Sequence, residues 1–538
     1  MPGRKILLVG SGASAVHFAL SALQKGHEVT MLDVGREGPP PVSPDLTFTG
    51  LKEKLPDPAA YFLGEKFEGV LYPGSSEEYY GFPPHRQFIF EGVPQFRTHP
   101  SGFAPLFSFA QGGLAEAWTG GAFPFTREEM EDFPVAYDEL APYYGVVAGR
   151  IGICGAADDL ARFLPVHDHL DPPLDLDDHS RLLLERYEKR RDRLNSTLRC
   201  YMGRSRVAVT REDRGERKGC DYIGRCLWGC PRDSLYVPSL SLKECRKQPG
   251  FTYMPGFFAS HFKAGAGGCI GALVAEPVRG GPPVELPVET LVLGGGTLST
   301  ARIFLESVRR ESGKAVRLTG LMDNQQMLMP FISPAMIGKP YDPETYQYHQ
   351  LALGIEGARP KDYIHGLVTT LKTALCHPIV QNVPFDFRTS LFIFRNVHSA
   401  LGLVNINLND TRRDENFVGL ESDAAGPGAA LTIRYVSGPR EAGRIADAMK
   451  KVNRVLRALG CIVPPGMTHI RPMGASVHYA GTLPMSATPA PLTTSKDCRS
   501  HDFENLLIVD GSTLPFLPAK NVTFTLMANA ARVADVAF

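Results

Sequence analysis

The sequence predicts an α/β protein in which a parallel, Rossmann-like sheet is interleaved with an α+β domain built on an antiparallel sheet. Three observations lead to this prediction. An apolar strand, a Gly-rich turn and a helix follow one another at the N-terminus, and the segment 505–538 repeats the order of strand, Gly-containing turn and helix. Between them lie several short apolar segments of strand character. A chain of 538 residues has enough length for two or more domains.

The N-terminal element is a βαβ unit. Residues 6–9 form an apolar run typical of a buried parallel strand. A helix is expected over 13–25 and a second strand over 28–33. The turn between the first strand and the helix fits G-x-G-x-x-G/A, as Gly10-Ser11-Gly12-Ala13-Ser14-Ala15. The spacing indicates a dinucleotide-binding unit, with a Gly-rich loop in some other α/β unit as the alternative.

The residues of this turn have separate expected functions. Gly10 permits the tight turn, and Gly12 lets the backbone approach a pyrophosphate at the helix N-terminus, together with Ala13 and Ser14. Asp33 ends the second strand about 20 residues further on, where an acid binds a ribose hydroxyl. An acid at this place favours FAD or NAD over NADP.

A second Gly-rich turn follows the strand expected at Thr290–Leu293. It contains Gly294, Gly295 and Gly296 and precedes a helix. Two interpretations stay open for it. It could be another nucleotide-binding turn, or a close crossing of two backbones beside a cofactor bound elsewhere.

The C-terminal segment returns to the first domain. A strand is expected over 506–509, followed by Asp510-Gly511, and a helix from near Val522 to the end of the chain. Asn521 stands at the expected start of this helix, where an Asn side chain is a favourable N-cap. This return is unlike a simple NAD dehydrogenase.

Three further segments, 111–125, 132–144 and the C-terminal pair 477–482 and 506–535, resemble the glucose–methanol–choline family of flavoprotein oxidoreductases. The resemblance follows the order of the chain and, together with the N-terminal turn, implies FAD as the cofactor. It implies oxidation of an alcohol group to a carbonyl, with hydride transfer to flavin N5. The resemblance also implies further cofactor contacts at Gly112, Gly113, Trp118, Gly120, Gly121, Gly295, Asp510, Gly511, Val522 and Thr523.

The same resemblance places His478 at the family's general-base position and Asn521 at the partner position. A neutral imidazole can accept a hydroxyl proton, whereas an amide cannot act as a base. Two prolines usual in the family are replaced, by Tyr479 and Val522, which restores two backbone N–H groups. The alternative is that His478 is structural and Asn521 only caps the helix. Glu116 is expected at the surface.

A Cys-rich loop spaces Cys220, Cys226 and Cys230 as C-x5-C-x3-C. The loop is similar to one that ligates an iron–sulfur cluster in some dehydrogenases of the family, so a cluster here is a second hypothesis. The spacing fits no standard ferredoxin pattern, and a fourth ligand would be missing. The favoured interpretation is a loop of packed thiols or one disulfide, and no metal site is assigned.

The expected FAD-binding domain is discontinuous, over 1–45, 90–155, 195–315 and 465–538, and the substrate-binding domain takes 46–89 and 316–464. In the latter, 389–410 is expected to form consecutive strands, and 438–460 an amphipathic helix. Polar residues there could line a sugar pocket, but an outward orientation is the default for them: Tyr346, Gln347, Asn405 and Asn407.

Composition limits the remaining function classes. Lys and Arg number 57 and Asp and Glu number 57, so no charge excess points to nucleic acid or a membrane surface. No apolar run is long enough to span a membrane, and the chain is expected to be cytoplasmic. The expected partner is a small alcohol, a sugar or polyol, with oxygen, a quinone or a protein as electron acceptor. The alternatives are a dehydrogenase subunit with an iron–sulfur cluster and a non-redox FAD-containing lyase.

Overall fold

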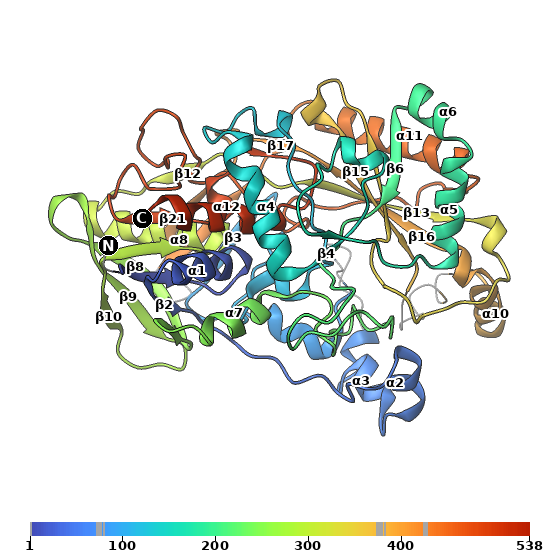
Figure 1. Ribbon diagram of the computed structural model, residues 1–538, viewed down its shortest axis with the longest axis horizontal. Coiled ribbons are helices and arrows are strands. Elements are labelled where there is room, and N and C mark those ends of the chain that lie inside the picture. The colour runs from blue at the N-terminus through green and yellow to red at the C-terminus, as the bar shows by residue number, and fades with distance from the viewer. Residues whose placement is uncertain (1–2, 71–77, 79–80, 373–379, 381–382, 423–428) are drawn as a thin grey trace.

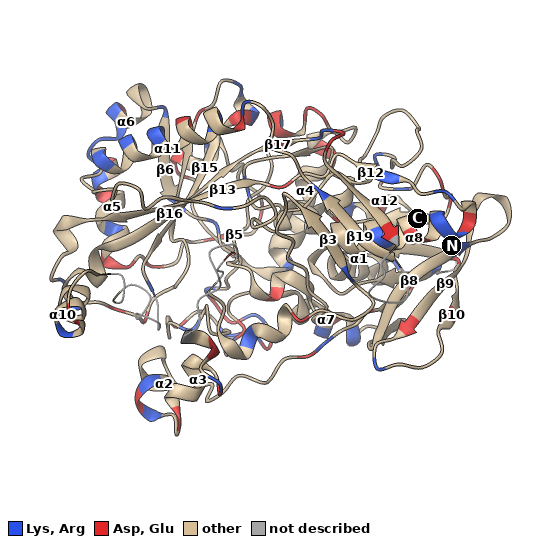
Figure 2. Ribbon diagram, turned by 180° about the vertical axis from the view of Figure 1, so that it is seen from behind, with Lys and Arg blue, Asp and Glu red and all other residues tan. Residues whose placement is uncertain are grey.

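The computed structural model describes residues 3–70, 78, 81–372, 380, 383–422 and 429–538. Parts of the expected substrate-domain ranges 46–89 and 316–464 therefore lie outside the described residues. Two bodies lie side by side, one around a parallel sheet that holds both chain ends and one around an antiparallel sheet (Figure 1). Basic and acidic residues are interspersed over both bodies (Figure 2). Within the described residues no helix is both long and apolar enough to cross a membrane.

The first body contains a five-stranded sheet in the order β21-β11-β1-β2-β7. All four pairings in it are parallel, which confirms the Rossmann-like prediction. The C-terminal strand β21 pairs with β11, so the end of the chain does return to the N-terminal unit. The strands are β1 (Lys5–Val9), β2 (Glu28–Leu32), β7 (Phe251–Met254), β11 (Thr290–Leu293) and β21 (Leu506–Ile508).

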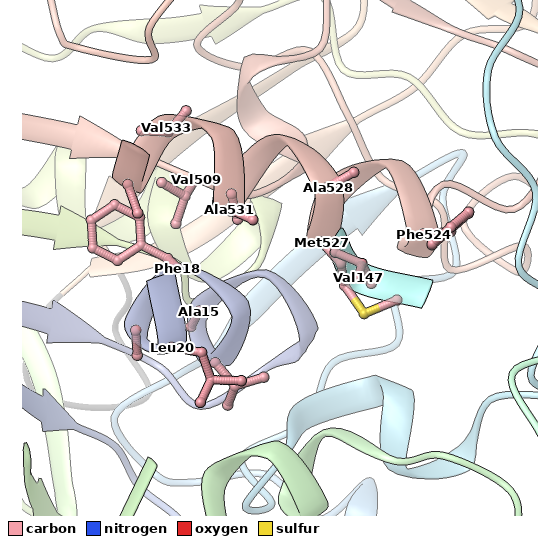
Figure 3. Close-up of a cluster of buried hydrophobic side chains, with 14 of the residues drawn as sticks. Ala15, Phe18, Leu20, Val147, Val509, Phe524, Met527, Ala528, Ala531 and Val533 are labelled. Atoms are coloured by element: carbon pink, nitrogen blue, oxygen red, sulfur yellow. The ribbon is translucent and has the colours of Figure 1, made fainter. Parts of the chain in front are cut away.

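Alternate side chains of β1 belong to two separate cores. Ile6 and Leu8 belong to one core, and Leu7 and Val9 to the other, as expected for a strand covered on both faces. The C-terminal helix α12 packs against α1 in the first core, to which Phe18, Val147 and Met527 belong (Figure 3). The helices around the sheet are α1 (Ala13–Gln24), α4 (Tyr137–Ile151), α7 (Pro238–Arg246), α8 (Thr297–Ser312) and α12 (Thr523–Val536).

Two smaller sheets extend this body. A three-stranded antiparallel sheet, β10-β9-β8, contacts α8 through β8. A four-stranded sheet, β12-β18-β19-β3, contacts the same helix through β18. These strands are β3 (Thr98–Ser101), β8 (Phe257–Ala264), β9 (Ile270–Pro277), β10 (Val284–Pro287), β12 (Arg317–Thr319), β18 (Phe417–Ser422) and β19 (Ala429–Arg434).

The second body is built on a six-stranded sheet in the order β20-β13-β16-β15-β14-β6, and every pairing is antiparallel. Its apolar face packs with α5 (Asp178–Glu188) and α11 (Glu441–Ala458), the latter as the sequence predicts. The range 195–315 contributes one edge strand to this sheet. The strands are β6 (Cys200–Arg204), β13 (Gln325–Ile332), β14 (Leu351–Ile355), β15 (Ile364–Thr370), β16 (Leu401–Leu408) and β20 (His469–Ile470).

The expectation of consecutive strands over 389–410 is wrong in its first half. Phe387–Val397 is a helix, α10, and only β16 follows as a strand. The Asp386 side chain accepts hydrogen bonds from the backbone N–H groups of Arg388 and Thr389 and so caps the helix. Ser390 and Phe394, one helical turn apart, are its buried residues. Local capping and a helical apolar spacing therefore overrode the β-branched and aromatic composition.

Candidate active site

The main cavity lies at the carboxyl ends of β1, β2 and β11 and is also lined by the first residues of α1, α8 and α12. This is where open α/β sheets bind ligands. Twelve of the residues expected to contact a cofactor line it: Gly10, Gly12, Ala13, Ser14, Asp33, Gly112, Gly113, Gly295, Asp510, Gly511, Val522 and Thr523. The cavity is therefore the place where four segments distant in sequence meet.

The two glycines of the first turn, Gly10 and Gly12, have different structural roles. Gly10 has φ +95°, and a Cβ placed on it would lie 2.8 Å from the carbonyl oxygen of Gly294. This close approach decides between the two interpretations of the Gly294 turn in favour of crossing backbones. Gly12 is the N-cap of α1 with φ −66°, and a Cβ on it would meet no atom within 4 Å. The space beside Gly12 opens into the cavity, so the bare backbone forms a cradle at the helix N-terminus.

Asp33 is held by two residues that the sequence reading missed. Its Oδ2 accepts hydrogen bonds from the Ser11 hydroxyl and, at 3.1 Å, from the Tyr253 hydroxyl. Ser11 Oγ also accepts a bond from the Gly112 backbone N–H at 2.9 Å, which ties the Gly112 loop to the first turn. Burial raises the pKa of Asp33 to about 6, although these hydrogen bonds oppose the rise.

Asp510 lines the cavity, but its carboxylate accepts hydrogen bonds from other residues of the protein. Oδ2 accepts bonds from the Gly296 N–H at 2.9 Å and the Thr300 hydroxyl at 2.5 Å, and Oδ1 accepts from the Ser512 N–H at 3.0 Å. Asp510 thus fixes the start of α8 against the C-terminal segment. A ligand at this position would therefore contact the neighbouring backbone and not the carboxylate.

Trp118, Gly120 and Gly121 are not among the residues that line the cavity, and their loop packs against other parts of the protein. The Trp118 ring N–H donates to the Tyr236 carbonyl at 2.6 Å. Gly120 has φ +72°, and a Cβ there would lie 2.8 Å from Leu235 Cδ1.

The prediction of a surface position for Glu116 is wrong. Its carboxylate accepts a bond from the Ser239 backbone N–H at 2.9 Å, and burial raises its pKa to about 7. The bond anchors the start of α7 to this loop.

His478 is flanked by two cavity-lining residues, Val477 and Tyr479. Its Nδ1 lies 2.9 Å from Asn324 Oδ1. Desolvation lowers the pKa of His478 to about 4, and the nearby Arg471 charge adds to the shift. The imidazole is therefore neutral at pH 7 and can accept a proton.

The loop before His478 is held in a strained shape by a buried carboxylate. Val477 has φ +66°, in the left-handed region that a β-branched residue rarely adopts. Asp323, fully buried, accepts bonds from the Gly474 N–H at 2.6 Å, the Ser476 hydroxyl and the His478 N–H at 3.3 Å. Burial raises the pKa of Asp323 to about 7. These bonds offset the strain and set the position of His478.

Asn521 is not the helix N-cap that the sequence suggested. Helix α12 begins at Thr523 after Val522, and no side chain caps it. Instead, Asn521 Oδ1 is buried without a protein partner. Asn521 Nδ2 and His349 Nε2 lie 3.3 and 3.2 Å from the point where a Cβ on Gly121 would stand, and His349 Nε2 is also without a partner. Two unsatisfied polar side chains therefore adjoin the same small space beside Gly121.

The face of the six-stranded sheet opposite its apolar core is polar. Gln326, Asn407 and His365 are direct cross-strand neighbours, and Gln326 Nε2 donates to Asn407 Oδ1 at 2.7 Å. The default outward orientation is wrong for Asn407, Tyr346 and Gln347, which are all buried. Asn405 lies partly buried on the same face as Asn407, and its Oδ1 has no protein partner.

Cys220, Cys226 and Cys230 are free thiols that pack against a buried cluster including Val207, Leu235 and Tyr346. In the described part of the chain, no group of three or more His, Cys, Asp or Glu side chains is arranged to hold a metal ion. Burial raises the pKa of Cys220 to about 11, which favours the thiol over the thiolate that ligates metals. The loop therefore packs as small hydrophobic side chains, and the iron–sulfur hypothesis finds no support.

The two turn glycines give a matched test of the cradle. Gly12→Ala should fold normally, because its backbone suits alanine and the new methyl points into the cavity, but it should weaken FAD binding at least about tenfold. Gly10→Ala should instead lower the free energy of unfolding by roughly 1–3 kcal/mol through strain. Flavin fluorescence titration and denaturant unfolding measure the two effects. Equal effects of both changes on FAD affinity and stability would contradict the assignment.

Comparisons with known proteins agree with this geometry. The family model described as GMC oxidoreductase matches residues 412–530. The chain is 23% identical over 546 residues to paromamine 6'-oxidase of Streptomyces fradiae, covering 98% of this chain and 90% of that one. It is 24% identical over 565 residues to 2-methyl-1,2-propanediol dehydrogenase of Mycolicibacterium austroafricanum, covering 98% and 94%.

Among solved structures, pyridoxine 4-oxidase from Mesorbium loti superposes with a TM-score of 0.60 at 16% identity, covering 99% of both chains. A formate oxidase superposes with a TM-score of 0.60 at 11% identity, covering 99% of this chain and 98% of that one. These structures share the fold along the whole chain. Residues 412–530 therefore match the C-terminal part of a GMC oxidoreductase, and the chain is similar over its full length to the oxidase and the dehydrogenase named above.

Proposed function

We propose that this protein oxidises an alcohol group of a sugar or polyol to a carbonyl, with FAD as its cofactor and His478 as the general base. One observation carries the proposal: a histidine that is neutral at pH 7 stands beside a cavity whose other end has the form of a dinucleotide cradle. The relatives support the reaction class, since the names of two of them, paromamine 6'-oxidase and pyridoxine 4-oxidase, describe oxidases.

The residues present fit FAD. The open side of Gly12 and the N-terminus of α1 suit a pyrophosphate, and Asp33, fixed by Ser11 and Tyr253, suits a ribose hydroxyl. Val522, Thr523 and Gly511 also line the cavity, with Gly511 beside the Tyr479 carbonyl, and would hold the ring system. FAD, when bound, supplies the acceptor for the hydride that leaves the alcohol carbon.

The protein's own part in the reaction concerns the hydroxyl proton. His478 Nε2 would accept it as the carbonyl forms, and a neutral imidazole is the form that can do so. Asn521 would orient the substrate oxygen from the other side by donating an amide N–H from Nδ2, which adjoins Gly121. The shift of the His478 pKa reflects a site that excludes water, which also protects the reacting groups.

A polar substrate is favoured by the unsatisfied atoms around Gly121 and on the sheet face. His349 Nε2, Asn405 Oδ1 and Asn521 Oδ1 are buried, and buried polar atoms normally find partners. Burial lowers the pKa of His349 to about 4, so this side chain too is neutral and suited to a hydroxyl group. A sugar or polyol would provide several hydroxyls for these atoms.

His349→Phe should therefore raise KM for a polyol substrate roughly tenfold or more. Removing the imidazole would leave a substrate hydroxyl buried without a hydrogen-bond partner, which costs about 1–3 kcal/mol. The value of kcat should change much less. The comparison of KM and kcat under steady-state conditions decides this. A loss confined to kcat would argue against a substrate-binding position for His349.

The function is tested by incubating FAD-loaded protein with a panel of sugars, polyols and simple alcohols, once with oxygen and once with an artificial dye as acceptor. Mass spectrometry of the products should show loss of two hydrogens from at least one polyol. A product that keeps all its hydrogens, formed equally well without any acceptor, would instead identify a non-redox lyase and overturn the proposal.

A further inference from the structure

We infer that Asn324 is a positioning residue that fixes which nitrogen of His478 carries the proton, so that Nε2 faces the substrate as the bare, proton-accepting atom. Asn324 belongs to no segment that resembles the family pattern, and it lies in the polar run just before β13. The inference rests on the proposed function only for its catalytic consequence. The tautomer itself is a property of the folded chain.

The orientation of the Asn324 amide follows from its partners. Asn324 is 1% exposed, and its Nδ2 lies 2.9 Å from the Leu408 carbonyl and 2.8 Å from the Pro518 carbonyl. A carbonyl oxygen only accepts hydrogen bonds, so the atom facing these two must be the NH₂ group, which has two hydrogens to donate. Both donors are thereby used, and the remaining atom of the amide is an oxygen.

That oxygen determines the state of the imidazole. Asn324 Oδ1 lies 2.9 Å from His478 Nδ1, and an amide oxygen can only accept. Nδ1 must therefore carry a hydrogen in this contact. Since the imidazole is neutral, its single N–H is at Nδ1 and Nε2 keeps its lone pair. In the other tautomer, two acceptors would face each other in a buried site.

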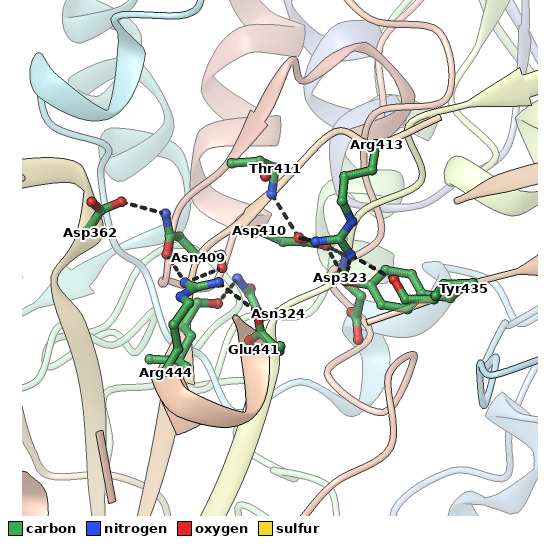
Figure 4. Close-up of polar contacts among 12 residues, drawn as sticks. Asp323, Asn324, Asp362, Asn409, Asp410, Thr411, Arg413, Tyr435, Glu441 and Arg444 are labelled. Carbon is green, nitrogen blue, oxygen red and sulfur yellow. Dashed lines mark hydrogen bonds and ion pairs between the residues drawn. The ribbon is translucent and has the colours of Figure 1, made fainter. Parts of the chain in front are cut away.

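The location of Asn324 extends this control beyond the imidazole ring. Leu408 ends β16, and Pro518 precedes the segment that carries Asn521. Asn324 follows Asp323, which accepts the His478 backbone N–H and donates its own backbone N–H to Asp410. Asp410 in turn accepts from the Tyr435 hydroxyl and pairs with Arg413 (Figure 4). Two adjacent residues thus hold the backbone and the ring of His478, and Asn324 also contacts the segment that leads to Asn521.

A matched control exists in the same chain. Asn505 has the same bonding pattern: Oδ1 accepts from the Ile270 N–H at 2.7 Å, and Nδ2 donates to the Ile270 and Glu289 carbonyls at 2.9 and 3.0 Å. Asn505 contacts none of the residues around His478. Replacing it costs the same kinds of hydrogen bond without touching the imidazole.

The direct experiment is nitrogen-15 NMR of histidine-labelled, FAD-free protein, with the His478 signal assigned from its loss in His478→Gln. The wild type should show His478 protonated at Nδ1 and bare at Nε2, and Asn324→Leu should populate the Nε2–H tautomer. This readout is independent of activity, so it stands even if the proposed function fails. A wild-type His478 protonated at Nε2 would overturn the inference, whatever the variants do.

The kinetic experiment compares Asn324→Leu and Asn324→Asp with Asn505→Leu and Asn505→Asp in FAD-loaded protein. Asn324→Leu should lower kcat about tenfold or more with little change in KM. Asn324→Asp keeps an acceptor opposite Nδ1–H and adds a negative charge, so the acidic limb of the kcat/KM profile should move up by about one pH unit or more. The Asn505 variants should leave kcat and this limb unchanged. Identical kcat values and pH profiles in the two series would contradict the inference.

Discussion

Replacing His478 with alanine is expected to slow alcohol oxidation by roughly 10²–10⁴-fold while FAD stays bound, because the side chain acts on the hydroxyl proton and does not line the cofactor cavity. The loss should appear in kcat, with a much smaller change in KM. Steady-state kinetics on the FAD-loaded variant, normalised to flavin content, measures it.

The control is His179→Ala. His179 is also buried, and desolvation lowers its pKa to about 4 as well, but it belongs to α5 and packs against Phe331 on the apolar side of the antiparallel sheet. This variant should lose stability and keep its kcat. A similar decrease in kcat for both variants would mean that His478 acts only through packing.

The same prediction has a pH dependence. Because the pKa of His478 is lowered to about 4, activity should persist well below pH 6.5 and fall as the pH decreases through about 4, where the imidazole gains a proton.

The buried histidines also link pH to stability. Their neutral folded forms contribute stability that is present above pH 6.5 and is lost as the pH falls towards 4.

Replacing Lys520 with methionine is expected to lower the free energy of unfolding by about 3–5 kcal/mol, the usual effect of removing one partner of a buried ion pair. Lys520 Nζ lies 2.7 Å from Glu129 Oε2, and the two side chains are 0% and 1% exposed. The ammonium also donates to the Pro124 and Phe163 carbonyls at 2.7 and 2.6 Å. Its removal leaves the buried Glu129 carboxylate without its cationic partner and the two carbonyls without this donor.

Denaturant unfolding of Lys520→Met and of Lys247→Met provides the measurement. Lys247 is exposed and pairs with Glu216 and Glu244, so its replacement should leave the free energy of unfolding nearly unchanged. Adding Glu129→Gln to Lys520→Met should recover part of the loss. Equal destabilisation by the two lysine replacements would show that the buried pair contributes no more than a surface pair.

Much of the cofactor side could be predicted from the sequence, since its determinants are local. Gly10 and Gly12 stand in a fixed spacing between a strand and a helix, and Asp33 follows at a distance set by the βαβ geometry. Gly112 and Val522 followed from the family resemblance. Each of these positions depends on backbone shape over a few residues, and such shape leaves a recognisable pattern.

The residues that control His478 left no such pattern. Asn324 and Asp323 lie more than 150 residues from His478 in sequence, and the orientation of the Asn324 amide depends on the carbonyls of residues 408 and 518. The polar run of residues 323–326 before an apolar strand was the available signal. The predicted strand over 389–398 and the predicted cap at Asn521 are wrong for a different reason. Both rest on local propensity, whereas the Asp386 cap determines the helix and the site geometry determines the position of Asn521.

The cofactor and the base are tested together by the visible absorption spectrum of FAD-loaded protein, mixed with polyols in the absence of oxygen. We expect a flavin spectrum that bleaches with at least one polyol, rapidly in the wild type and at least about 100-fold more slowly in His478→Ala. Protein that takes up no FAD would contradict the assignment of the cavity. Bleaching at equal rates in both proteins would contradict the assignment of the base.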